Sequence, residues 1–139
     1  MNHKTVETYV LSMPNAELTY PFGEDVAVYK VGGKMFALIA EKSKPIRLSL
    51  KCDPQLAVIL RETYETVMEG YHLNKKHWNT IVLSGQLPDE EVQGLIRHSY
   101  DLVIGAPNAG QFSGLLPEKP INPSFLILQK RSKRTDPRP

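Results

Sequence analysis

The 139-residue sequence lacks several features that define whole classes of protein. Its single cysteine, Cys52, excludes an intrachain disulfide, which is typical of a reducing compartment and predicts a cytoplasmic location. No apolar run approaches the roughly 20 residues that cross a bilayer. The first ten residues also lack the apolar core of a secretion signal. With 41% apolar and 23% charged residues, the chain is expected to be globular, with no contact to a membrane.

Sequence signatures of catalysis and of metal binding are also missing. There is no nucleophile elbow and no paired-carboxylate motif, and Gly32-Gly33 lacks the lysine and hydroxyl residue of a phosphate loop. His72 and His77 are five residues apart, without a nearby cysteine or carboxylate to complete a metal site. Cys52 precedes a helix start, which can activate a thiol, but no base accompanies it. We therefore expect no enzyme, no metal and no cofactor, with an unrecognised active site as the remaining alternative.

The net charge of +2 hides an uneven distribution. Residues 129–139 hold five basic side chains against one acidic, a net of +4, so the other 128 residues carry a net of −2. Within those, residues 30–51 hold six basic side chains against one acidic. A local positive field of this kind attracts polyanions even to a nearly neutral domain.

Local patterns predict helices and strands in alternation. Apolar residues at helical spacing indicate a helix over 5–13, which ends before Pro14. Asp53-Pro54 and the acidic run at 89–91 are typical helix starts, and Gly105 is a typical helix end. Valine-rich and aromatic runs at 26–31 and 34–40 predict a hairpin around Gly32-Gly33, which would place Tyr29 opposite Phe36. Further strands are expected at 46–51, 67–69 and 78–83, the first with a cationic outer face.

This order of elements predicts an α+β fold, an antiparallel sheet backed by helices. The folded domain is expected to span residues 1–104. Residues 105–139 hold six of the eleven prolines and read as a Pro-rich tail with a basic end. Within it the apolar run Phe125–Leu128 is expected either to dock on the domain or to mediate contact with a protein partner or a second copy.

Several blocks give the chain a resemblance to the MmcQ/YjbR family of small bacterial proteins. They are Pro21-Phe22-Gly23, Tyr29–Leu38, Leu48–Pro54, Tyr71–Thr80 and the helix start Leu87–Glu91. The resemblance covers roughly residues 1–104 and implies the CyaY (bacterial frataxin) fold. It also implies a DNA-binding role, attached to a "double wing" arrangement of the sheet. Iron handling, as in frataxin, is not expected, because the first helix offers no acidic ridge.

The leading hypothesis is weak, low-specificity binding of double-stranded DNA, mainly through phosphates. The proposed nucleic-acid-binding residues are Lys42, Lys44, Arg47, Lys51, His72, Asn74, Lys75, Lys76, His77 and Trp78. For the block at 72–78 the alternative is a turn in which Asn74 caps the backbone and Trp78 packs in the core. For the lysines and arginine the alternative is an ordinary solvated surface. The competing function is a protein-interaction or small-ligand module without a nucleic-acid role.

Overall fold

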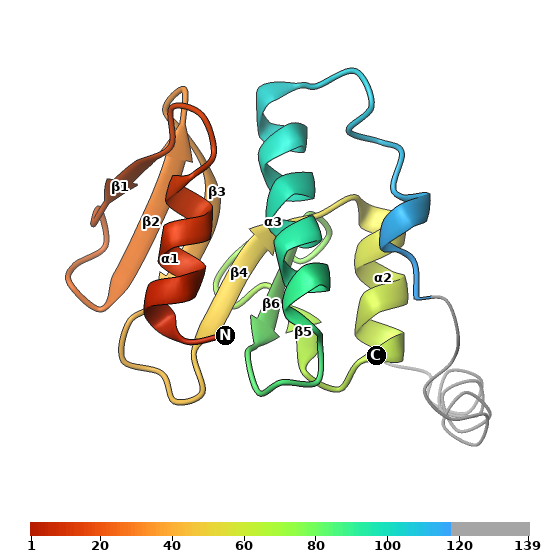
Figure 1. Cartoon of the computed structure of the whole chain (residues 1–139), viewed down its shortest axis with the longest axis horizontal. Helices are drawn as coiled ribbons and strands as arrows, with labels where there is room; N and C mark the ends of the chain where they lie inside the picture. Colours follow the sequence, from red (N-terminus) through yellow and green to blue (C-terminus); the bar gives the residue numbers. More distant parts are fainter. Residues whose placement is uncertain (118–139) are drawn as a thin grey trace.

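Six strands form one antiparallel sheet, and three helices cover one of its two faces (Figure 1). The computed structural model describes residues 1–117. The elements, in chain order, are α1 (His3–Leu11), β1 (Glu17–Thr19), β2 (Val26–Val31), β3 (Lys34–Ala40), β4 (Arg47–Lys51), α2 (Pro54–Thr63), β5 (Val67–Glu69), β6 (Trp78–Val82), α3 (Asp89–Ile104) and the 3-10 helix η1 (Ser113–Leu115). The strand order in the sheet is β1-β2-β3-β4-β6-β5. The predicted α+β class is confirmed.

Capping residues determine where the helices begin and end. The Asn2 side chain accepts a hydrogen bond from the N–H of Thr5, so α1 starts at His3, two residues earlier than expected. Asp53 caps α2 as predicted, and α3 ends at Gly105, which adopts the left-handed conformation with φ of 72°. The short edge strand β1 is not among the strands predicted from the sequence.

The hairpin of β2 and β3 contains a β-bulge that cannot be predicted from the residues of its turn. Gly32 and Gly33 have positive φ and form the predicted turn. Further along, Phe36 is left without a partner and Tyr29 pairs with Ala37. The predicted pairing of Tyr29 with Phe36 is therefore wrong, because the extra residue in β3 displaces every later pair by one.

The hydroxyl of Ser99 on α3 stabilises this bulge. Ser99 is fully buried. Its Oγ donates to the carbonyl of Phe36 over 2.5 Å and accepts from the N–H of Lys51 over 2.9 Å. The ring of Phe36 packs edge-to-face on Tyr100 at a centroid distance of 5.4 Å. A single helical segment thus fixes β3 and the end of β4 together.

The two faces of the sheet are covered very differently. The main core lies between the sheet and the helices and contains fully buried side chains such as Val10, Ile39 and Ile96. On the other face lies a small cluster of Val28, Leu38 and Trp78, which no helix of residues 1–117 covers. We call this second side the open face. It leaves room for a binding site directly on the strands.

The described part of the predicted tail packs against the domain. Phe112 and Leu115, around η1, contact the main core. The apolar run Phe125–Leu128 lies outside the described residues, so its docking stays a prediction. Within residues 1–117 no helix combines the length and apolarity that crossing a membrane requires.

Replacing Ser99 by alanine is expected to lower the free energy of unfolding by about 1–3 kcal/mol, because it leaves the carbonyl of Phe36 and the N–H of Lys51 buried without a partner. Chemical denaturation checks this, with the exposed Ser84→Ala as the matched control. Equal stability of the two variants would contradict the role given to the Ser99 hydroxyl.

Stability is also expected to depend on pH through His98. Burial lowers the pKa of His98, although the charges of Asp53 and Asp101 oppose this, and its Nε2 accepts the N–H of Asp53 over 3.1 Å. The unfolded chain takes up this proton near pH 6.5 and the folded chain only at lower pH. The contribution is therefore complete above about pH 6.5 and is lost as pH falls through the lowered value. His98→Gln should show a smaller loss of unfolding free energy between pH 7 and pH 5, and an identical loss would refute the assignment.

Candidate functional site

The open face carries a pocket of about 350 Å³ beside the small cluster of Val28, Leu38 and Trp78. Its floor and walls come from strands β2, β3, β4 and β6, and its rim from the turn after β1, the loop before β4 and the loop between β5 and β6. The residues that matter for binding are Phe22, Val26, Leu38, Arg47, Tyr71 and His72. The volume lies within the range of small-molecule sites, and the lining is mostly apolar, as in such sites.

Exposed aromatic rings surround the mouth of the pocket. Phe22 and Tyr71 are each 65% exposed, which is unusual for rings of this size. The imidazole of His72 lies against Tyr71 at a centroid distance of 4.0 Å. His72 has a positive φ of 58°, a conformation that non-glycine residues rarely adopt. The rim therefore offers flat surfaces on which a planar ligand can stack.

Some polar side chains that line the pocket are hydrogen-bonded within the protein, and others are available to a ligand. The hydroxyls of Ser49 and Thr80 bond each other across β4 and β6 at 2.8 Å, and Thr80 Oγ1 also accepts the N–H of Tyr71 over 3.0 Å. Arg47 is exposed, and no hydrogen bond or ion pair engages its guanidinium within residues 1–117. Because an arginine can hold a planar anion with two donors, Arg47 is the group best placed to anchor a negative charge.

The structure brings together only some of the predicted site residues. Arg47 and His72 both line the pocket. Lys44 is exposed in the loop that leads into β4. Lys42 is also exposed but forms an ion pair with Asp25 at 2.9 Å, which offsets part of the positive field at this loop.

Trp78 is 8% exposed and packs in the small cluster of the open face. Its indole presents little free surface on which a base could stack, which favours the packing alternative over the predicted stacking contact. Lys51 lies directly opposite Trp78 in the β4–β6 ladder and is half-buried. Gly70 allows the start of the loop to lie close to the backbone of Trp78, since a Cβ at Gly70 would lie 2.6 Å from the Cβ of Trp78.

The tip of the loop between β5 and β6 has mainly structural contacts. The Asn74 side chain accepts the N–H groups of Lys76 and His77 at 2.9 and 3.1 Å, which is the capping role considered as an alternative. Lys75 and Lys76 are exposed, but neither lines the pocket. The carbonyl of His77 accepts a hydrogen bond from the N–H of Cys52 over 2.8 Å.

Cys52 offers no nucleophile to this surface. Burial, helped by the charge of Asp53, raises the pKa of its thiol to about 12, although Arg61 opposes the shift. The thiol is therefore protonated at neutral pH, and the helix N-terminus beside it does not activate it. This supports the structural interpretation of the residue.

Two sets of potential site residues were not predicted from the sequence. Phe22 and Tyr71 stood in the family-like blocks but were not assigned to the site. His3, Glu7 and Glu41 form a second cluster, whose ligand atoms all lie within 4.8 Å of one another. The spacing of His3 and Glu7, four residues apart at a helix start, was the available signal. Glu41 joins them only through tertiary structure.

Comparison with known proteins places the chain among small bacterial domains. The YjbR family model matches residues 11–102. The uncharacterized protein YbdF of Escherichia coli O157:H7 is 35% identical over 73% of this chain and 84% of its own length. The uncharacterized protein YjbR of Escherichia coli K12 is 34% identical over 69% of this chain and 81% of its own length. The crystal structure of Deinococcus radiodurans protein DR2400 is similar with a TM-score of 0.71 and 36% identity, covering 84% of this chain and 89% of that one.

Substituting Gly70 by alanine is expected to lower the free energy of unfolding by about 1–3 kcal/mol, because the new methyl group would clash with Trp78. Tryptophan fluorescence follows the unfolding directly, since Trp78 is the single tryptophan. Gly110→Ala is the matched control, as a Cβ there meets open space. The assigned packing is refuted if both variants unfold at the same denaturant concentration.

Proposed function

The chain belongs to the YjbR family, and we propose that it binds nucleic acid by accepting one unpaired base in the pocket of the open face. The observation that supports this most directly is that aromatic rings and a cationic side chain lie together at that pocket. Exposed rings of Phe22, Tyr71 and His72 surround an apolar floor, and the guanidinium of Arg47 beside them has no partner within residues 1–117.

The concave shape of the pocket is the reason to propose an unpaired base as its ligand. A base within a duplex is stacked on both sides and cannot enter a pocket, whereas a base in a single strand or a flipped base can. Each aromatic ring at the rim offers a stacking surface worth roughly 1–3 kcal/mol per base, with little preference for sequence. The proposal therefore moves the expected target from the double-stranded DNA of the sequence hypothesis towards single-stranded nucleic acid.

Charge supports contact with the phosphates on either side of that base. Arg47 lies at the pocket, Lys44 precedes it in the loop, and Lys51 follows it along the same face of β4. Such contacts position the strand without reading its sequence, and they make binding sensitive to salt.

The blocks that carry the family resemblance meet at this pocket. Phe22 comes from the block Pro21-Phe22-Gly23, Ser49 from the block in β4, and Tyr71 and His72 from the block before β6. Their convergence in space supports a binding role for this surface beyond packing. We propose a binding role without catalysis, supported by a pocket lining that, among residues 1–117, contains no carboxylate to pair with His72.

A free small molecule is the second candidate. The lining is mostly apolar and the pocket is of ligand size, which suits a planar aromatic anion as well as a base within a strand. The two candidates differ in what lies outside the pocket, because only a strand engages Lys44 and Lys51.

Fluorescence anisotropy of a labelled single-stranded oligonucleotide at low salt tests the proposal. Tyr71→Ala is expected to weaken binding about 5- to 100-fold through the loss of one stacking surface. Arg47→Ala should weaken binding and lower the dependence on salt by about one phosphate contact. The variant Lys4→Glu, with the charge reversed on α1, is the control and should bind nearly as the wild type does.

Three outcomes separate the hypotheses. Equal or tighter binding of a duplex of the same length would contradict the proposal that an unpaired base enters the pocket. Binding of a mononucleotide as tight as that of the oligonucleotide would favour the small-ligand candidate. No binding of either at low salt, or binding unchanged in both Tyr71→Ala and Arg47→Ala, would overturn the proposed function.

A further inference from the structure

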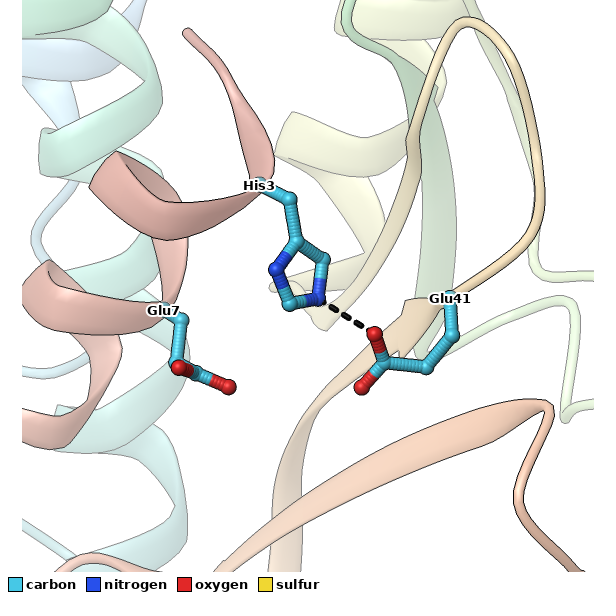
Figure 2. A group of neighbouring side chains, drawn as sticks. All are labelled: His3, Glu7 and Glu41. Atoms are coloured by element: carbon cyan, nitrogen blue, oxygen red, sulfur yellow. Dashed lines mark ion pairs between the residues drawn. The ribbon is translucent and has the colours of Figure 1, made fainter.

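We infer that His3, Glu7 and Glu41 form a binding site for a divalent transition metal ion such as Zn²⁺. The three side chains come from two elements and point into a common space (Figure 2). His3 and Glu7 stand one helical turn apart on α1, and Glu41 directly follows the last residue of β3. The site is distinct from the pocket of the open face and does not depend on the proposed function.

The donor set and its spacing suit such an ion. The ligand atoms lie within 4.8 Å of one another, and all three residues are half-buried. A bound Zn²⁺ takes nitrogen and oxygen ligands at about 2.0–2.2 Å, so small side-chain movements would bring the three donors to one ion. Imidazole together with two carboxylates favours Zn²⁺, Co²⁺ or Mn²⁺ over Mg²⁺ and Ca²⁺, which prefer oxygen ligands alone.

Two tyrosines orient the carboxylates from outside. The hydroxyl of Tyr29 donates to Glu7 Oε2 over 3.0 Å, and the hydroxyl of Tyr20 donates to Glu41 Oε1 over 3.1 Å. Each glutamate therefore has one oxygen held by a neutral donor. Such outer contacts are a regular part of metal sites, because they fix the ligand before the ion arrives.

The imidazole nitrogen of His3 supports the same assignment. Its Nε2 atom is shielded from solvent, and no hydrogen bond of good geometry satisfies it within residues 1–117. Its near neighbour is Glu41 Oε2, at ion-pair distance. A buried imidazole nitrogen between two carboxylates is the arrangement in which a cation would satisfy all three groups.

The surroundings leave space for further ligands of the ion. A hollow of about 540 Å³ opens at the cluster, and Tyr20 and Glu24 complete its lining. Three protein ligands with an open position are typical of metal sites that also hold water or a small ligand. The positive charge of an ion here would also be offset by Glu24 nearby.

Isothermal titration of the full chain with Zn²⁺ tests the inference, with Co²⁺ absorption as a second readout of ligand number. We expect one ion per chain, with Mg²⁺ unable to displace it. Glu7→Gln and Glu41→Gln should each weaken Zn²⁺ binding at least tenfold while circular dichroism shows an unchanged fold. Tyr20→Phe, which removes only an orienting hydroxyl, should weaken binding about tenfold.

The control is Glu65→Gln, an exposed glutamate next to β5, at the opposite edge of the sheet from β1. It should bind Zn²⁺ as the wild type does. The absence of saturable Zn²⁺ binding would overturn the inference and leave a simple ion pair between α1 and β3. Binding that is equally tight in Glu7→Gln, Glu41→Gln and the control would overturn it too, because the ion would then sit elsewhere.

Discussion

Both faces of the sheet depend on one buried hydroxyl. Ser99 satisfies the carbonyl that the bulge at Phe36 leaves without a strand partner, and it holds the end of β4 at the same time. The bulge decides which side chains of β3 point to each face, because side chains alternate along a strand and one extra residue reverses them. Without it, Leu38 would leave the open face, and the floor of the pocket would be different.

The uneven covering of the sheet explains why binding groups gather where they do. Helices and sheet bury a continuous core on one side, which supplies most of the hydrophobic stabilisation. On the open face a loop that begins at Gly70 takes the place of a helix and covers Trp78. Because a loop covers less surface than a helix, apolar floor and aromatic rim stay accessible beside it. The site is thus built from the segment that completes the packing.

Local signals predicted most of the fold, and tertiary contacts determined what they missed. Asp53, Gly105 and the two turn glycines act on their immediate neighbours, so the sequence alone placed the elements around them. The bulge at Phe36 is stabilised by a residue 63 positions away, which no local pattern reports. For the same reason Arg47 and His72 were recognised as binding candidates, while the partners that complete their pocket were not. Trp78 was ambiguous because its burial depends on a loop that passes over it.

The sheet ends on both sides in a strand of only three residues, β1 and β5. Each carries a glutamate, Glu17 on one side and Glu69 on the other, and both are exposed. Short, charged edge strands offer few free backbone groups to a neighbouring copy of the chain, and their like charges repel the same strand of that copy. Crowded solutions of this protein should accordingly resist the growth of cross-β fibrils, even though the middle of the sheet is rich in valine, leucine and isoleucine.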